Sequence, residues 1–181
     1  TGEQAGIAHY TYFLVKHLLA LDKKNHYTLF IDKRLKSVKE FEQENVKTHI
    51  VPFSQYKKYL PFAYSHLLFS GELEEARLDL FHSPFPIIPL RYKGASVVTV
   101  HDMAIYHHPE WFPGVAKQIL STKVLVPRAL KNAKQIISVS EFTKRDVMDL
   151  FKVPEEKITV IPEGVAEESS KLESSKLKVK R

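Results

Sequence analysis

Cysteine is absent from the 181 residues, and glycine, methionine and tryptophan are scarce, with six, two and one occurrences. Without cysteine the chain has no disulfide framework, no thiolate metal ligand and no thiol nucleophile. Long apolar runs are also missing, since no stretch reaches the length of a membrane-spanning helix. These absences leave a globular domain held by an ordinary hydrophobic core, and a cytoplasmic setting is the expectation.

What the chain does contain is apolar material for a core and an excess of basic residues. Hydrophobic residues make up 44% and aromatic residues 11%, and the net charge is +6. This charge favours anionic partners such as sugar phosphates, phospholipid head groups or nucleic acid, although a lysine-rich solvated surface is the simpler explanation. The basic residues are dispersed rather than interleaved with aromatics in one stripe, so we expect no nucleic-acid partner.

Apolar patterning alternates between helix-like and strand-like segments. Ile7, Tyr10, Leu14, Leu18 and Leu21 recur every three or four residues, as on a helix packed on one side. Short apolar runs predict the strands HYTLFID, VKTHIVP, LDLFHSP, SVVTVHD, QIISVS and KITVIPEG. Strands that alternate with helices form βαβ units. The predicted fold class is therefore α/β, a Rossmann-like domain whose mostly parallel sheet is flanked by helices.

Further helices are predicted between these strands. They cover LKSVKEFEQEN at 35–45, an aromatic segment at 56–78, a segment at 115–133 that Pro127 should kink or divide, and EFTKRDVMDLF at 141–151. In the last of these we expect Ser140 as the N-cap. We expect inward positions for Val147, Leu150 and Phe151.

The carboxyl-terminal residues differ from the rest. They contain the tandem repeat ESSKL-ESSKL at 168–177, with no aromatic residue, glycine or proline. This composition predicts a linker over 167–181.

Polar residues, and in one case a glycine, end several of the predicted strands. They are His82 and Ser83, His101 and Asp102, Ser140 and Glu141, and Glu163 and Gly164. In an open α/β sheet, ligands bind outside the carboxyl ends of the strands, where these residues fall. A turn, a cap or a structural histidine explains each residue singly, but their convergence at one edge favours a binding site.

The chain opens with TGEQAGIAHYTYFLV, a glycine-bearing loop that runs into a helix with no strand before it. After a strand, such a loop lets backbone amides approach a phosphate. Gly2 and Gly6 would serve this role at the same sheet edge. We therefore expect a fragment that lacks the first strand of its domain, which also suits a start at Thr1 rather than at methionine.

The order and spacing of several segments resemble one family. GEQAGIAHYTYFLV, DLFHSP, VVTVHDMAIYHHPEWFP and ISVSEFTKRDVMDLFKVPEEKITVIPEGV together resemble the amino-terminal domain of retaining glycosyltransferases of family four, the glycosyl transferases group one, which have the GT-B fold. The resemblance covers residues 2–166. Glu163 stands where the family usually has the asparagine of Pro-Asn-Gly-Val. Members similar in the opening and TVHD segments are often mannosyltransferases or related enzymes that build surface polysaccharide.

The resemblance implies transfer of a sugar, with mannose as a candidate, from a nucleotide sugar to a hydroxyl acceptor with retained configuration, in glycan or polysaccharide biosynthesis. Residues 1–166 would be the acceptor-side domain, and 167–181 would lead to an absent carboxyl-terminal domain that grips the donor. The isolated chain is then expected to be inactive. The family needs no metal, so we expect no cofactor besides the nucleotide-sugar substrate.

The resemblance also assigns roles to residues of the predicted edge. By motif, His101 is the catalytic histidine beside the donor sugar. The substrate-binding residues are expected to be Gly6, Ile7, His82, Asp102, Ser140 and Glu141. Many acceptors of the family are lipid-linked, and YKKYLPFAYSHLLF joins lysine, tyrosine and phenylalanine as an interfacial segment would. This pattern suggests peripheral contact with the inner face of a membrane, while a buried amphipathic helix explains it equally well.

Two other functions stay open at this point. A metal-dependent hydrolase could use His82, His101, Asp102, His107 and His108 as ligands, but HDMAIYHH lacks the helical H-x-x-x-H spacing. The chain could instead be a non-catalytic binding subunit that completes a transferase with a separately encoded partner. A metal assay tests the first alternative, and the reading frame beyond Arg181 tests the second.

Overall fold

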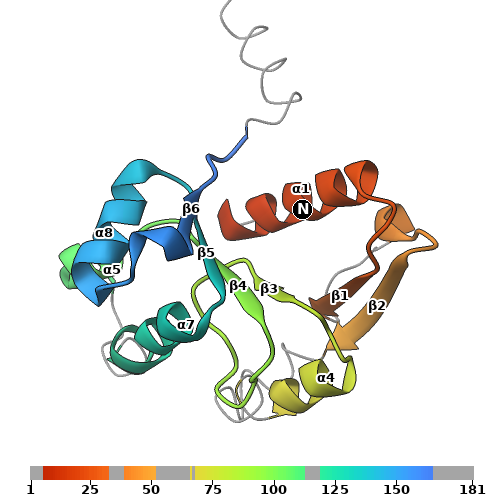
Figure 1. Cartoon of the computed structure of the whole chain (residues 1–181), viewed down its shortest axis with the longest axis horizontal. Coiled ribbons are helices and arrows are strands. Elements are labelled where there is room, and N and C mark those ends of the chain that lie inside the picture. The colour runs from red at the N-terminus through yellow and green to blue at the C-terminus, as the bar shows by residue number, and fades with distance from the viewer. Residues whose placement is uncertain (1–5, 33–38, 52–65, 67, 113–118, 165–181) are drawn as a thin grey trace, which may run out of the picture.

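A computed structural model describes residues 6–32, 39–51, 66, 68–112 and 119–164. Their strands are all paired in parallel, as the alternating pattern predicted. They form two sheets, one of β1 (Tyr27–Asp32) and β2 (Val46–Val51), the other in the order β3 (Phe81–Ser83), β4 (Ser96–Val100), β5 (Gln135–Ser138) and β6 (Ile158–Val160). The fold class is thus confirmed, while the single sheet we expected is divided in two. Figure 1 shows β1 on the side of its pair that faces β3.

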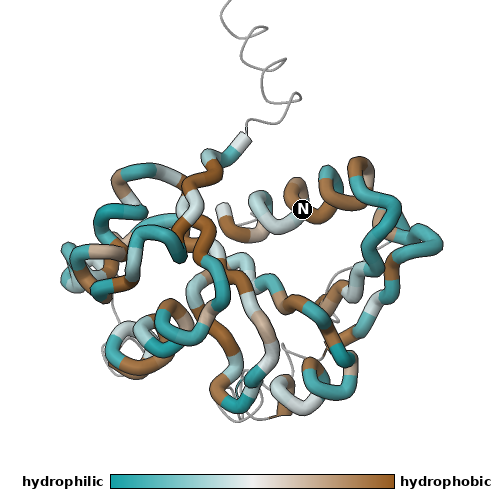
Figure 2. Tube along the Cα trace, viewed as in Figure 1, coloured by the Kyte–Doolittle hydropathy of each residue, from teal (hydrophilic) through white to brown (hydrophobic). Residues whose placement is uncertain are grey.

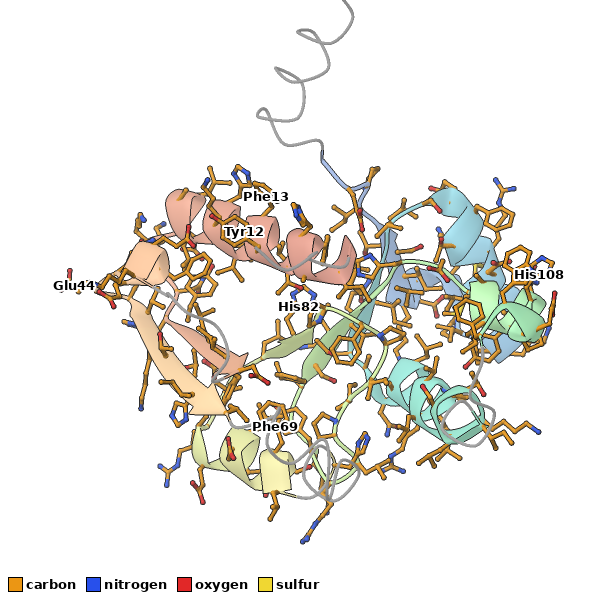
Figure 3. All side chains as sticks on the ribbon, turned by 180° about the vertical axis from the view of Figure 1, so that it is seen from behind. Tyr12, Phe13, Glu44, Phe69, His82 and His108 are labelled. Atoms are coloured by element: carbon orange, nitrogen blue, oxygen red, sulfur yellow. The ribbon has the colours of Figure 1, made fainter. Side chains whose placement is uncertain are left out.

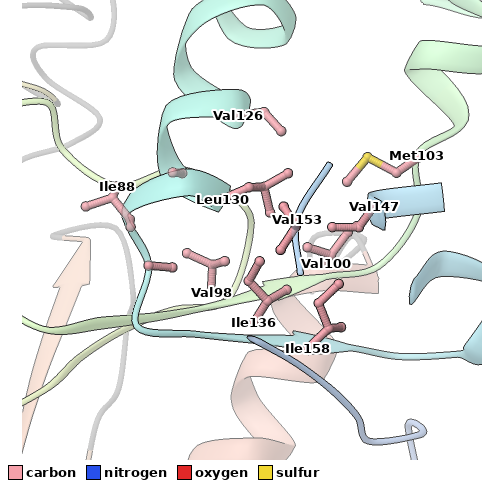
Figure 4. Packing of buried hydrophobic residues seen from close by; sticks show 12 residues of the cluster. Ile88, Val98, Val100, Met103, Val126, Leu130, Ile136, Val147, Val153 and Ile158 are labelled. Carbon is pink, nitrogen blue, oxygen red and sulfur yellow. The ribbon is translucent and has the colours of Figure 1, made fainter. Parts of the chain in front are cut away.

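The four-stranded sheet carries the main core. Successive side chains of a strand point to opposite faces of the sheet. By this alternation and the strand register, Val98, Val100, Ile136 and Ile158 all point to one face, where they are buried. Helices α7 (Val126–Asn132) and α8 (Glu141–Phe151) cover this face. Figure 4 shows Leu130 and Val147 of these helices directed onto the strand residues. The hydropathy tube in Figure 2 is accordingly brown along much of the central strands.

Helix α1 (Gly6–Leu21) crosses the opposite face and runs from the end of β4 towards β1 and β2 (Figure 1). Its predicted apolar stripe is only partly packed. Leu19 is the one buried residue in the helix, whereas Leu18 and Leu21 of the stripe are 37% and 86% exposed. The expectation of a helix packed along this stripe is therefore wrong for most of its length, because the part of α1 between the two sheets covers no described strand.

The remaining described elements are short. They are the 3-10 turns η1 (Lys39–Phe41), η3 (Pro109–Trp111) and η5 (Glu155–Lys157), the helices α4 (Phe69–Glu75) and α5 (Ala104–His107), and the π-helical turn η4 (Ser121–Leu125). None of the helices in the described ranges is both long and apolar enough to cross a membrane.

Three helix predictions have a mixed outcome. The segment 35–45 forms no long helix in its described part, where η1 is followed by a turn into β2. Pro127 does not interrupt the helix, because residues 119–132 are helical throughout, but the helix changes from the π-helical turn η4 to α7 at Val126, one residue before the proline. In segment 56–78, residues 56–65 and 67 lie outside the described residues, and α4 occupies 69–75.

Helix α8 follows its prediction except at one position. Ser140 is its N-cap, and Val147 is fully buried. Phe151 packs against the core from a half-buried position. Leu150, predicted to point inward, is 40% exposed. Val147 and Phe151 are four residues apart and share one line of the helix, whereas Leu150 is turned away from that line towards solvent.

Candidate functional site

The predicted polar residues lie at the carboxyl ends of adjacent parallel strands. His82 belongs to β3, His101 follows β4 directly, Ser140 follows β5, and Glu163 follows β6. Since these strands are neighbours in the order β3-β4-β5-β6, their carboxyl ends meet at one edge. The sequence prediction that these residues share an edge is therefore confirmed as geometry.

The imidazole of His101 is held on three sides. Its Nε2 lies 2.9 Å from the carbonyl oxygen of Pro84, which can only accept, so Nε2 donates. Its Nδ1 lies 2.7 Å from Oε1 of Glu163. The ring of Tyr10 meets it edge-on, with centroids 4.8 Å apart. The His101 side chain is 17% exposed, so the ring is oriented by the protein and remains within reach of solvent.

A second histidine lies deeper, beneath α1. His82 Nε2 is 2.9 Å from Oγ1 of Thr99, and the same hydroxyl is 3.1 Å from Oη of Tyr10. Thr99 is fully buried, and burial lowers the pKa of His82, which favours its neutral form. Figure 3 shows His82 under α1. This chain of polar groups fixes the first turns of α1 against β3 and β4.

Ser140 anchors the start of α8 at the same edge. Its Oγ accepts a hydrogen bond of 3.0 Å from the backbone N–H of Thr143. Thr143 is buried, and its hydroxyl donates to the carbonyl oxygen of His101 at 3.2 Å. The N-cap therefore also fixes the backbone of His101. Glu141 lies in the first turn of α8 and is exposed.

The other predicted residues have simpler surroundings. Oδ1 of Asp102 accepts from the backbone N–H of Ala104 at 2.9 Å, so this carboxylate caps the turn after His101. Gly6 and Ile7 form the exposed start of α1, and Ile7 is 43% exposed. A Cβ at Gly6 or at Gly164 would meet no atom within 4 Å. Gly2 lies outside the described residues.

Sequence reasoning missed Tyr10, Thr99 and Thr143 as members of this site. Tyr10 was assigned to an apolar stripe, although its hydroxyl is the group that reaches Thr99. The signal for Thr143 was available, because Ser140 and Thr143 are separated by the spacing of an N-cap and its N3 residue. Thr99 lies in a run of valines. Its hydroxyl, in a strand that ends at one histidine and next to a predicted strand that contains another, was the sequence signal for a polar contact.

The histidines proposed as metal ligands are dispersed. Nε2 of His107 pairs with Oδ2 of Asp146 at 3.0 Å. His108 stacks on Trp111 and bonds Glu110, and Figure 3 shows it far from His82. Over the described ranges no three histidine, aspartate or glutamate residues gather as a metal site. The hydrolase alternative is therefore wrong in its ligand set, since all five residues invoked for it are described.

The parallel strands, the flanking helices and the polar carboxyl edge define a Rossmann-like α/β domain. The family model described as Glycosyltransferase Family 4 matches residues 5–169. The chain therefore belongs to glycosyltransferase family 4, and its domain is of the Rossmann-like type found in the GT-B fold.

A curated relative extends this comparison. The chain is 27% identical over 163 residues to the O-antigen chain mannosyltransferase B of Escherichia coli. The match covers 84% of this chain and 42% of the relative. The chain thus spans about two fifths of the length of the curated relative it matches.

Proposed function

We propose that the polypeptide to which this domain belongs transfers a sugar from a nucleotide sugar to a hydroxyl acceptor, with retained configuration, and that the described domain forms the acceptor side. Membership of glycosyltransferase family 4 supports the reaction class. The name of the E. coli relative supports mannose as the sugar and surface polysaccharide as the product class. The observation that carries the proposal is the convergence of His82, His101 and Glu163 at the carboxyl edge of a sheet in this family.

His101 is the proposed catalytic residue. The end of β4 and the Thr143 hydroxyl fix its backbone, and Glu163 and Pro84 orient its ring. A sugar hydroxyl or the acceptor would replace one of these two ring partners. Glu163 is the exchangeable one, because its side chain is 47% exposed, while Pro84 offers a backbone carbonyl. The role of His101 is to position and polarise the substrate, and the leaving phosphate takes the acceptor proton.

The residue types at this edge also suggest which part of the polypeptide binds the donor diphosphate. The site residues named above provide imidazoles, hydroxyls and carboxylates, and none of them is a lysine or arginine. A diphosphate is best bound by cationic side chains and by helix amino termini. We therefore assign most of the binding of the donor diphosphate to a second, carboxyl-terminal domain that would follow residues 167–181. Basic side chains there, with the loop at Gly6 and Ile7, would neutralise the leaving group without a metal. The 181 residues alone should then transfer no sugar.

The acceptor in this proposal is a glycan, free or linked to a lipid. A lipid-linked acceptor would bring the enzyme to the cytoplasmic face of a membrane. The excess of basic residues suits anionic head groups. Leu68, at the described end of the aromatic segment, is 56% exposed.

The test is a transfer assay on the complete polypeptide with nucleotide-activated mannose, and with other nucleotide sugars, in the presence and absence of a chelator. His101→Ala should lower turnover by about tenfold to a hundredfold, the value of one hydrogen bond of 1.5 to 3 kcal/mol in a water-poor site. His101→Gln should recover part of the loss. His108→Ala is the matched control, because His108 is an exposed histidine of the same loop that stacks on Trp111.

Two results would contradict this assignment. Full activity of His101→Ala would remove the residue from catalysis. An equal loss of melting temperature and activity would make His101 a structural histidine. Absence of transfer from every nucleotide sugar by the complete polypeptide would overturn the reaction class itself.

A further inference from the structure

Tyr10 of α1 lies between the two histidines of the candidate site. Its Oη is 3.1 Å from Oγ1 of Thr99, and the same Oγ1 is 2.9 Å from Nε2 of His82. Its ring meets the imidazole of His101 at 85°, with the centroids 4.8 Å apart. One side chain of α1 therefore connects this helix both to a buried group of β4 and to the histidine that follows the strand.

The first turns of α1 have little apolar packing to hold them in place. Leu19 is the one buried residue of the helix and lies near its other end. Residues 6–9 are exposed, and Tyr10 is the first residue of α1 that is half-buried. The hydrogen bond to Thr99 and the ring contact with His101 thus join this end of α1 to the four-stranded sheet.

The Thr99 hydroxyl is a fixed anchor for Tyr10. Thr99 is fully buried in β4, and buried hydroxyls of folded proteins are hydrogen-bonded in the large majority of cases. A hydroxyl has one hydrogen to donate and two lone pairs, so it can bond His82 and Tyr10 at the same time. Removal of the Tyr10 hydroxyl would leave Thr99 bonded to His82, and the loss would therefore fall on the position of α1.

The ring of Tyr10 limits the orientation of His101. The torsion that turns an imidazole ring has broad intrinsic preferences, so the neighbours of the ring set its orientation. Pro84 and Glu163 hold the two ring nitrogens, but in the proposed function a substrate replaces Glu163. The ring could then turn about its remaining hydrogen bond to Pro84, and the edge-to-face contact with Tyr10 opposes this turn.

We propose that Tyr10 is a positioning residue for sugar transfer, which keeps the His101 imidazole in its reactive orientation after substrate has replaced Glu163. The inference rests on the proposed function, because it assigns Tyr10 to the same reaction. Tyr10 acts through His101, since its ring restrains the imidazole and its hydroxyl holds that ring in place through Thr99. Phenylalanine at this position keeps the ring contact and loses the hydrogen bond, whereas leucine loses both.

Steady-state kinetics of the complete polypeptide test this role. Tyr10→Phe should lower kcat about threefold and Tyr10→Leu about tenfold or more, because a catalytic group that can turn spends less time in the reactive geometry. The KM of the nucleotide sugar should change by less than about twofold in both variants, since a restraint that acts on the reacting groups affects kcat rather than uniform binding.

Tyr12→Phe is the matched control for these variants. Tyr12 lies on the same helix, and its hydroxyl bonds Glu40 of η1, on the side of the two-stranded sheet. The substitution removes the same group from α1 and should leave kcat within about twofold of the parent value. Equal losses of kcat in Tyr10→Phe and Tyr12→Phe would indicate general loosening of α1 and would overturn the proposal. Parent-like kcat of Tyr10→Leu, where His101→Ala is impaired, would overturn the proposal and leave the proposed function intact.

Nuclear magnetic resonance measures the restraint without any transfer reaction. In the 181-residue chain, Glu163→Ala removes the carboxylate partner of His101, as substrate would. The carbon order parameter of the His101 ring should stay high in this variant and should fall when Tyr10→Leu is added, but not when Tyr12→Phe is added. An unchanged order parameter in the double variant with Tyr10→Leu would overturn the proposal, even where kcat falls. If the complete polypeptide transferred no sugar, the proposed function would fail, whereas a fall of this order parameter would still support the restraint by Tyr10.

Discussion

The four-stranded and the two-stranded sheets share one parallel architecture but differ sharply in how well they are packed. Among the described residues, the core on the four-stranded sheet contains twelve buried residues, which come from β4, β5, β6, α7, α8 and the loops between them. The cluster beside β1 and β2 contains three of the described residues, namely Val51, Phe69 and Leu73. In β1 no residue is fully buried, although the strand is as apolar as those of the larger sheet.

This difference shows where the chain can stabilise itself. His82, His101 and Glu163 of the candidate site lie in or just after strands of the well-packed sheet. In the described part of the chain, α1 and α4 each contact both sheets, through Tyr10 and Tyr12 of α1 and Phe69 of α4. Substitutions in the two regions should therefore have different effects.

The largest effect is expected in the larger core. Leu130 of α7 is fully buried, and Leu130→Ala should lower the free energy of unfolding by about 3 to 5 kcal/mol, because the close-packed neighbours cannot fill the cavity. Urea unfolding followed by circular dichroism measures this. A loss below 1 kcal/mol would show that the region around α7 is no better packed than the smaller cluster.

The matched substitution in the smaller cluster should cost less. Leu73 of α4 is also fully buried, but it has few buried neighbours. Leu73→Ala should lower the free energy of unfolding by about 2 kcal/mol, the lower end for such truncations. Hydrogen exchange should show faster opening of β1 and β2 and unchanged protection in β4 and β5. Equal loosening of both sheets would show that they unfold as one unit.

The sequence allowed prediction of the elements that have their own periodicity or caps. The valine run of β4 and the isoleucines of β5 read as strands because both of their faces are covered. Ser140 read as an N-cap because its spacing to Thr143 is local. The division of the described strands into two sheets could not be predicted, since local apolar patterns do not show which strands pair. The predicted burial of Leu18 and Leu21 in α1 was wrong because a periodic apolar stripe does not show whether another element packs against it.

The candidate site was predictable as an edge but not as a set of contacts. Strand ends identify His82, His101 and Glu163, because parallel strands bring their carboxyl ends together. The pairing of His101 with Glu163 joins residues 62 positions apart. The Thr99 hydroxyl contacts both His82 and Tyr10, and Tyr10 lies 89 positions before Thr99 in the sequence. Such pairings depend on side-chain rotamers and on the position of α1, which local patterns do not encode.

A smaller effect is expected at the cap that connects α8 to the site. Ser140→Ala removes the acceptor for the N–H of Thr143 and should lower the free energy of unfolding by about 1 kcal/mol. Thermal unfolding should show a melting temperature lower by roughly 2 to 4 °C. Ser140→Asp is the control, because aspartate also caps helices and should retain most of the stability. If Ser140→Ala were neutral, the cap would be compensated elsewhere in the larger sheet.

The smallest effect concerns pH and the depth of His82. Burial lowers its pKa in the folded chain from the ordinary value of 6.5, so below about pH 6.5 the unfolded chain binds a proton that the folded chain resists. Stability is therefore fully present above pH 6.5 and is lost as the pH falls towards the lowered pKa. Burial shifts the pKa of His66 in the same direction, so His82 accounts for part of this loss.

His82→Gln isolates the contribution of His82, because the glutamine amide can still bond the Thr99 hydroxyl and does not titrate. Between pH 7.5 and 5.5 the melting temperature of the variant should fall less than that of the parent chain, and the two should be similar at pH 7.5. Identical pH profiles for the parent chain and His82→Gln would mean that protonated His82 is accommodated under α1, and that the space beneath this helix is more open to water than the four-stranded sheet.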